Sequence, residues 1–213
     1  MSYFIEFIFR WAHVLSALMW VGLLYFFNVI QGEYLKEASA EAKSDVVAKL
    51  APRALWWFRW AAVATFVTGL YLLMSLGAGA NQYIYIAALM GTLMFLNVWL
   101  IIWPKQKIVC GMSAGDVPAA AATALLASRT NMVFSAPMLF GMLASKHGSF
   151  SANAGGMQPV SMSDAGFVIA LFIVLALQLN GVVGRLSVIA DVRGAVHCSL
   201  ALTVILYAII HFL

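Results

Sequence analysis

Three of the four histidines are predicted to lie at one depth of a helical bundle. His13, His147 and His211 each stand about 16 to 18 residues from the expected inner end of a long apolar segment, whereas His197 stands close to an inner end. At 1.5 Å per helical residue, this spacing places the three rings roughly 24–27 Å from the inner side. Imidazoles from separate helices are therefore expected to meet near the outer face.

A pair of such imidazoles predicts a haem site. Two neutral imidazoles from facing helices are the ligands that a six-coordinate b-type haem requires, and the cores of helical bundles commonly hold such cofactors. Arg10 precedes His13 by three residues, so it lies on the same helix face and nearer the outside. A guanidinium there suits bidentate contact with a haem propionate. Glu6 extends this face by another turn and is expected to pair with Arg10. The predicted cofactor is thus haem b, held by two of His13, His147 and His211, with Arg10 at a propionate.

Other interpretations of these residues stay open. A histidine at the end of a span is often an interfacial residue whose polar tip reaches the headgroups, which explains His147 and His211 equally well. Imidazole also suits copper and zinc, so a metal site made only of His13, His147 and His211 is a second alternative. Met138 and Met142 lie on the face of their segment that reaches toward His147, and a methionine axial ligand is a third.

The elements that would position these groups form an integral membrane bundle. Of 213 residues, 64% are hydrophobic and 9% are charged, and the mean hydropathy is +0.95. A soluble domain needs more charge to cover its surface, and each membrane span takes roughly 20 apolar residues. We therefore expect an all-α fold in which residues 1–213 form a single transmembrane domain with about six spans. The expected spans are 3–31, 54–76, 83–103, 131–147, 165–183 and 195–213.

The polar stretches between the spans predict short interfacial helices and loops. Residues Gly32 to Arg53 alternate in charge and carry apolar residues at steps of three and four, which indicates a helix lying at the interface that ends at Pro52. Asp116 and Pro118 would cap a second short helix before the fourth span. A loop rich in Gly and Ser is expected after the fourth span.

Lysine and arginine predict the orientation of the chain. Nine of them follow the first, third and fifth spans, and the opposite side has only Lys146. The nine are Lys36, Lys43, Lys49, Arg53, Lys105, Lys107, Arg129, Arg185 and Arg193. Because cytoplasmic loops carry the excess of Lys and Arg, both termini are expected outside, in the periplasm if this is a bacterial inner membrane. Basic residues in such short loops do not indicate a nucleic-acid partner.

Several other polar residues lie within the apolar segments. Arg59 either snorkels to the headgroups or makes an internal ion pair or substrate contact. Asn97, Gln178 and Asn180 are expected to join helices by hydrogen bonds.

A number of site classes are excluded by the absence of their motifs. Cys110 and Cys198 form neither CxxC nor CxxCH, which excludes covalent haem attachment within this chain. The chain has no P-loop, dinucleotide fingerprint, zinc-protease motif or nucleophile triad, and it lacks the paired intramembrane carboxylates of a transporter. The first apolar run has no basic n-region, so no cleavable signal peptide is expected.

Four segments, in order, resemble one bacterial membrane family, the N-terminal membrane domain of the membrane-bound urate oxidase (urate hydroxylase). They are RWAHVLSALMWVGLLYFFNVIQ from Arg10, ALWWFRWAAVATFVTGL from Ala54, NVWLIIWPKQK from Asn97 and SRTNMVFSAPMLFGMLASKH from Ser128. The resemblance covers about the first 150 residues. It implies a membrane oxidoreductase of the urate-oxidising type, with His13 and His147 as the matching histidines. Fuller members have more helices and a C-terminal cytochrome c domain, and they are implicated in passing electrons from urate to the respiratory chain.

The sequence is shorter than the fuller members and has no CxxCH, so a cytochrome c partner is expected to be a separate protein. One hypothesis is a haem b redox protein that passes electrons from a small substrate such as urate toward cytochrome c at the outer face. The alternative is a non-catalytic accessory or electron-relay subunit of a larger respiratory or oxidase complex. A third hypothesis is a structural membrane subunit without a cofactor. The lipid bilayer is the one partner common to all three.

Overall fold

The computed structural model describes residues 2–147 and 164–213, and the described chain is helical without strands. The predicted all-α membrane bundle is thus confirmed as the fold class. The loop rich in Gly and Ser expected after His147 lies almost wholly outside the described residues.

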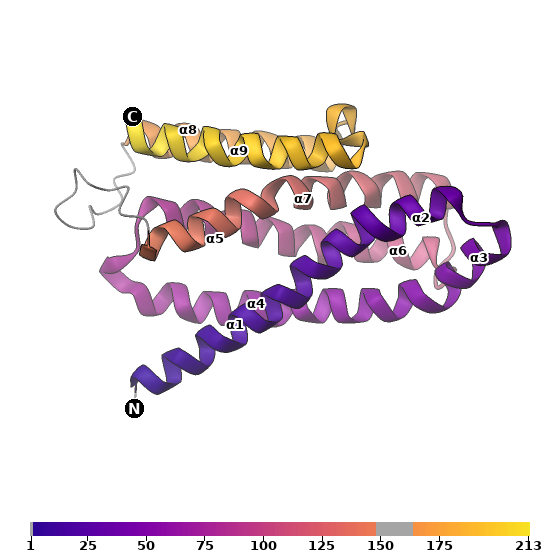
Figure 1. Ribbon diagram of the computed structural model, residues 1–213, viewed down its shortest axis with the longest axis horizontal. Coiled ribbons are helices and arrows are strands. Elements are labelled where there is room, and N and C mark those ends of the chain that lie inside the picture. Colours follow the sequence, from indigo (N-terminus) through magenta and orange to yellow (C-terminus); the bar gives the residue numbers. More distant parts are fainter. Residues whose placement is uncertain (1, 148–163) are drawn as a thin grey trace.

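The first two helices form a long hairpin (Figure 1). Helix α1 (Ser2–Tyr25) continues through the π-helical segment η1 (Phe26–Gln31) into α2 (Gly32–Glu37). After a turn at residues 38 and 39, α3 (Ala40–Asp45) continues through the π-helical η2 (Val46–Leu50) into α4 (Ala51–Leu76). Ser39 caps α3 by accepting a hydrogen bond from the amide of Ala42 at 3.3 Å.

This hairpin corrects the prediction of a separate interfacial helix over residues 32–53. The polar stretch is helical, but the turn at Ala38 and Ser39 divides it between the ends of two long helices. Pro52 stands in the first turn of α4, directly after η2, and the helical run continues through it from Ala40 to Leu76, so Pro52 does not end the helix.

The middle of the chain forms two further long helices. The 3-10 turn η3 (Gly77–Gly79) leads into α5 (Gln82–Leu96), which continues through the π-helical η4 (Asn97–Ile102) into α6 (Trp103–Val109). Helix α7 (Val117–His147) then runs unbroken for 31 residues, capped by Asp116, which accepts from the amide of Ala119 at 3.1 Å. The short helix expected after Asp116 is therefore the first part of the same helix as the fourth span.

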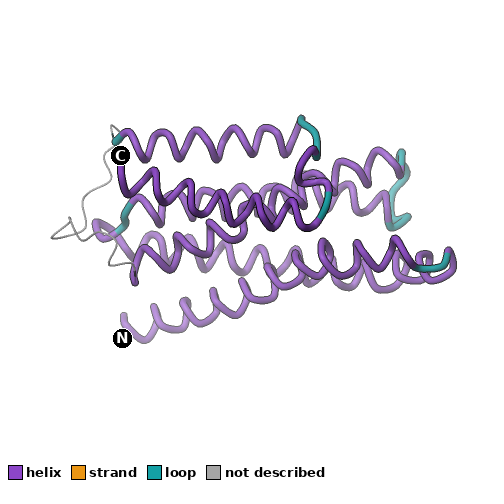
Figure 2. The backbone as a smooth tube through the Cα atoms, turned by 45° about the horizontal axis from the view of Figure 1, so that its top comes forward, coloured by secondary structure: helices purple, strands orange, loops and turns teal. Residues whose placement is uncertain are grey.

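The last two helices are α8 (Ala165–Val183) and α9 (Val192–Phe212), joined by the 3-10 segment η5 (Ser187–Ala190). In Figure 1 they cover one side of the bundle, while α1 and α4 form the other, with α5 and α7 between them. Figure 2 shows the same parallel arrangement after a turn of the molecule.

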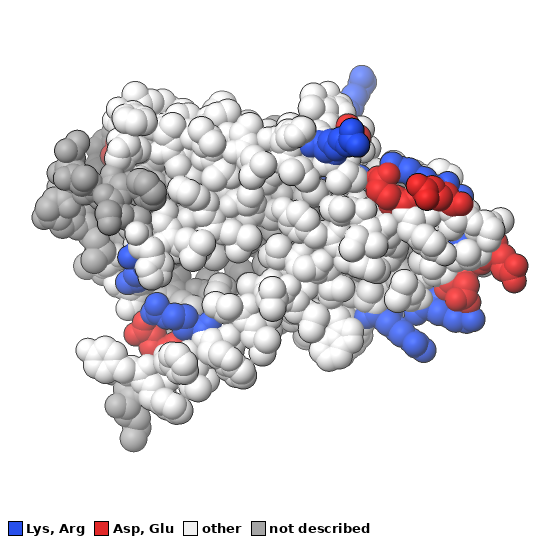
Figure 3. Space-filling model, in the orientation of Figure 1, with Lys and Arg blue, Asp and Glu red and all other residues white. Residues whose placement is uncertain are grey.

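Both chain termini lie at one end of the bundle, which we call the terminal end. The opposite end, which we call the basic end, contains the turn at residues 38 and 39, the turn at residues 110–116 and the connection 184–191. Charged side chains gather near the two ends in Figure 3, and the body between them is almost uncharged on the visible face. Such a pattern fits a body surrounded by lipid. The side of the membrane that each end faces stays a prediction.

Helix α7 is the buried centre of the fold. Within the described chain, five helical runs are long and apolar enough to cross a membrane: Tyr3–Glu37, Ala40–Leu76, Gln82–Val109, Ala165–Val183 and Val192–Phe212. The helix α7, which contains the predicted fourth span, is not among them. It packs against α5, α6, α8 and α9, so its surface faces protein and can carry polar residues.

Candidate functional site: a histidine in the first hairpin and the polar face of α7

His13 lies between α1 and α4, with its ring held by the main chain of α4. Its Nδ1 lies 2.9 Å from the carbonyl oxygen of Thr65 and 3.0 Å from the hydroxyl oxygen of Thr68. A carbonyl oxygen only accepts hydrogen bonds, so Nδ1 carries the proton and donates it. In the neutral ring, Nε2 then has the free lone pair. This is the tautomer that a metal-binding histidine adopts when a carbonyl orients it from behind.

Close packing fixes the position of this ring. A Cβ atom at Gly69 would lie 2.9 Å from Cε1 of His13, which is closer than real Cβ contacts. Only glycine therefore lets α4 approach the imidazole at this distance. Gly69 thus allows a close approach of α4 to α1, and its neighbour there is the candidate ligand itself.

Arg10 and Glu6 form the predicted ion pair one turn nearer the terminal end. Nη2 of Arg10 contacts Oε1 of Glu6, and the two side chains are 51% and 35% exposed. Because Glu6 engages only one of the guanidinium nitrogens, the described chain leaves other N–H groups of Arg10 available to a carboxylate ligand.

The other two predicted ligands belong to different helices, α7 and α9. His147 is the last residue of α7 and is exposed, and His211 is exposed in the last turn of α9. His211 lines a pocket of about 300 Å³ with Tyr83, Phe140 and Tyr207. Helix α1 packs mainly on α4, whereas α9 packs on α7 and α8, on the other side of the bundle (Figure 1).

The three histidines do not form a joint metal centre in the described chain. No group of three His, Cys, Asp or Glu side chains within residues 2–147 and 164–213 is arranged to hold a metal ion. The alternative of a copper or zinc site on His13, His147 and His211 stays a prediction. Whether His13 pairs with one other imidazole across a haem stays a prediction.

A row of polar residues on α7 binds the surrounding helices. Asn28 of η1 donates to the hydroxyl of Ser128 at 2.7 Å, and the hydroxyls of Tyr25 and Ser135 lie 2.9 Å apart. Asn28 and Ser135 are 3% and 0% exposed. These contacts attach the first hairpin to the central helix.

A second group of amides joins three helices on another face of α7. Asn97 of η4 donates to Asn131 at 2.8 Å and to Gln178 of α8 at 3.0 Å, and Gln178 donates back to Asn97 at 2.6 Å. Asn131 also donates to the carbonyl of Met94 at 3.0 Å. The prediction that Asn97 and Gln178 join helices is confirmed. Asn180 instead lies against the backbone of Arg185 after the end of α8.

The two buried asparagines outside α7 both lie in π-helical segments, Asn28 in η1 and Asn97 in η4. A π turn changes the direction of the side chains that follow it, and such turns recur at functional sites. Here each π turn brings an amide onto the polar row of α7. Sequence periodicity contains no signal for either turn.

Arg129 is a buried cation that the sequence analysis assigned to a loop. It lies inside α7 and is only 4% exposed. Its Nε has no hydrogen-bond partner in the described chain, and Nη1 lies 3.9 Å from the sulfur of Met132. The carboxylates of Glu33 and Asp191 act on it electrostatically from α2 and from the start of α9. The available signal was its position inside the polar run Ser128 to Asn131, directly before an apolar segment.

Arg59 makes a cation–π contact in place of the ion pair considered from the sequence. Its guanidinium carbon lies 3.8 Å from the ring centroid of Trp103 at the start of α6. The described chain gives it no carboxylate partner. Stacking on an indole stabilises a guanidinium that lies near the headgroup level.

These features define the class of the protein: an α-helical membrane protein with several spans and a polar, buried central helix. Within that class, residues 74–176 match the family described as "Urate oxidase N-terminal". The match contains the polar row of α7, Asn97, Gly141 and His147, whereas His13 and His211 lie outside it. Comparison with curated proteins and with solved structures gave no significant match.

The matched range agrees with part of the resemblance seen in the sequence, but it begins and ends later in the chain. The segments that begin at Asn97 and Ser128 lie inside it. The segments that begin at Arg10 and Ala54 lie before it, and the match extends past residue 150 into α8.

Proposed function

We propose that this urate-oxidase-like membrane protein is a redox protein that binds a b-type haem through Nε2 of His13. It would pass electrons from a small substrate such as urate toward cytochrome c at the terminal end. The observation that carries the proposal is the hydrogen bond from Nδ1 of His13 to the carbonyl of Thr65 at 2.9 Å. It orients the ring and leaves the second nitrogen free to act as a ligand.

The residues around His13 fit this role. Thr65 and Thr68 hold the imidazole from one side, and Gly69 lets α4 approach it closely. Arg10 lies three residues away on the same face and would exchange part of its contact with Glu6 for a propionate. A haem bound here would supply one-electron chemistry. His147, which lies within the family match, is the proposed second ligand.

The proposed location is the inner membrane of a bacterium, with the terminal end in the periplasm. Support comes from the excess of Lys and Arg at the basic end and from the position of both termini at the opposite end. A cysteine introduced at Ser2 and labelled in whole cells by an impermeant maleimide tests this orientation. Labelling only after lysis would contradict it.

A second candidate function is a non-catalytic accessory or electron-relay subunit of a larger membrane complex. The outward face of α1 favours it, since large apolar side chains are exposed there. They are Phe4, Phe7, Trp11, Val14 and Leu18, each at least 58% exposed. Lipid can cover this face, and so can a neighbouring subunit.

Optical spectra of the purified protein separate these functions from a structural role. We expect a dithionite-reduced α band of the b type that is lost in His13→Ala and retained in His197→Ala, an exposed histidine near the other end of the bundle. A colourless wild-type protein would overturn the haem proposal. Reduction of added cytochrome c on urate addition supports catalysis, whereas haem without turnover, together with co-purified oxidase subunits, supports the accessory role.

A further inference from the structure

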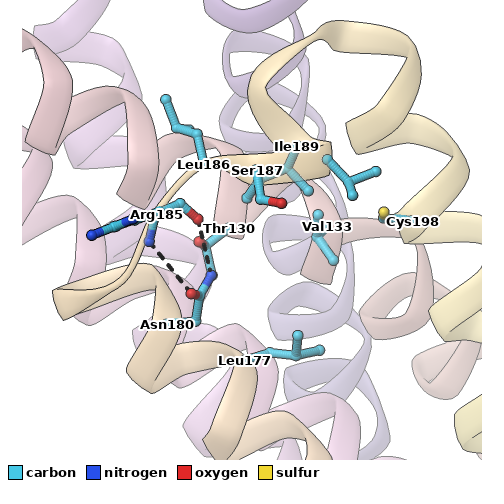
Figure 4. Close-up of a pocket in the computed structure, with 10 residues that line it drawn as sticks. Thr130, Val133, Leu177, Asn180, Arg185, Leu186, Ser187, Ile189 and Cys198 are labelled. Atoms are coloured by element: carbon cyan, nitrogen blue, oxygen red, sulfur yellow. Dashed lines mark hydrogen bonds between the residues drawn. The ribbon is translucent and has the colours of Figure 1, made fainter.

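A small pocket opens between α7, α8 and α9 near the basic end (Figure 4). It has a volume of about 180 Å³ and is roofed by the connection between α8 and α9. Ser187 in this connection has φ of 43°, a left-handed backbone conformation that residues other than glycine seldom adopt. The connection that covers the pocket therefore forms a tight turn after the end of α8.

The interior of the pocket is apolar. Its walls come from side chains of α7, α8, α9 and the roof, namely Val133, Leu177, Leu186, Val188, Ile189 and Cys198. Two of the polar groups beside them are already engaged. The Thr130 hydroxyl donates to the carbonyl of Leu126 at 3.0 Å, and the amide of Asn180 lies against the backbone of Arg185. An apolar ligand therefore fits this interior better than a polar one.

The size of the pocket limits the ligand further. Sites for drug-sized molecules are commonly about 300–1,000 Å³, so this pocket is too small for a tetrapyrrole or another large cofactor. A slim hydrocarbon chain fits such a space.

Arg185 places a cation at the rim of this pocket. The side chain of Arg185 extends away from the pocket in Figure 4, and the residue is exposed. It has no ion-pair partner in the part of the chain that the structure describes. The nearby Asp191 is engaged, because its carboxylate accepts from the amide of Gly194 and caps α9. Basic residues beside pockets between membrane helices, at the end rich in Lys and Arg, are typical of sites for anionic lipid headgroups.

We propose that this pocket binds an acyl chain of an anionic phospholipid whose phosphate contacts Arg185. The apolar interior, the volume and the cation at the rim together match such an amphiphile. The site lies apart from His13 and does not depend on haem binding.

Cys198 in the pocket wall gives a direct readout. A Cys110→Ser variant, in which Cys198 is the single remaining cysteine, is placed in nanodiscs of phosphatidylglycerol or of phosphatidylcholine and labelled with N-ethylmaleimide. We expect labelling at least about threefold slower in phosphatidylglycerol, because the bound chain covers the thiol. Equal rates in the two lipids would overturn the proposal.

One control separates occupancy of the pocket from the effect of surface charge. An anionic surface attracts protons and slows the reaction of any thiol nearby, so the Cys198→Ser variant reports this effect at Cys110, which also lies at the basic end. Burial raises the pKa of the Cys110 thiol, so its rate is compared only with itself between lipids. A slowing at Cys110 as large as that at Cys198 would contradict a bound lipid.

Variants of the rim test the contact with phosphate. Arg185→Ala should abolish the difference between lipids at Cys198, and Arg185→Lys should retain most of it. Arg193→Ala removes an exposed cation at the same end that does not line the pocket, and it should change nothing. Protection that persists in Arg185→Ala would overturn the proposed headgroup contact.

Discussion

The first hairpin and the central helix α7 use polar residues in opposite ways. In the hairpin, His13 is held through one ring nitrogen while the other has no partner among residues 2–147 and 164–213, and the ion pair of Arg10 with Glu6 lies at the surface. On α7 the polar groups of Asn131 and Ser135 are fully buried and bonded to neighbouring helices. The difference indicates that α7 holds the bundle together, whereas the hairpin presents a group that can bind a ligand.

The largest effect is expected from Gly141→Ala in α7. An added Cβ would lie 2.1 Å from the hydroxyl of Tyr207 and 2.9 Å from Cβ of Ala87, so Tyr207 must give up its hydrogen bond to the carbonyl of Pro137. Overpacking and loss of this bond should cost about 2–4 kcal/mol of unfolding free energy, measured by thermal unfolding in detergent. The matched control is Gly22→Ala, where nothing lies within 4 Å. Equal stability of the two variants would contradict this packing.

Asn131→Ala should cause the second largest loss of stability. It removes partners from Asn97 and from the carbonyl of Met94, both inside the bundle, at a cost of about 1–2 kcal/mol. Asn180→Ala, outside this group of amides, should leave the midpoint of unfolding nearly unchanged. If both variants unfold at the same temperature, the amide group does not join the helices.

Gly69→Ala tests the packing of His13 against α4 in the first hairpin. The new methyl group forces the His13 ring away from α4, so we expect a stability loss near 1 kcal/mol and a weaker bond to Thr65. The sharper readout is a changed visible spectrum of the protein, since the ring orientation changes. An altered stability with an unaltered haem spectrum would argue against His13 as a ligand.

The smallest effect is expected from Glu6→Gln. The ion pair is 51% and 35% exposed, and surface pairs of this kind contribute roughly 0.2–1 kcal/mol. Unfolding should shift by less than about 0.5 kcal/mol, and the shift should shrink in high salt. A shift as large as that of Asn131→Ala would mean that the hairpin is held by charge and not by packing.

The sequence was most informative where periodicity and local pairing decide the structure. The spans, the cap at Asp116 and the pair of Glu6 with Arg10 all follow from residues a few positions apart. It was least informative where helices meet. Arg129 was assigned to a loop because lysine and arginine were counted by position alone, and nothing local reveals that α7 is enclosed by its neighbours. The three histidines were placed by depth, but depth does not determine the direction that each helix face takes around the bundle.

Replacement of the His13 side chain by free imidazole is the sharpest test of the proposed bond between Nε2 and haem iron. His13→Gly leaves a space that added imidazole can enter. We expect the low-spin b-type spectrum to be lost in this variant and to return when imidazole is added. A His13→Gly protein that keeps the wild-type spectrum without imidazole would contradict it.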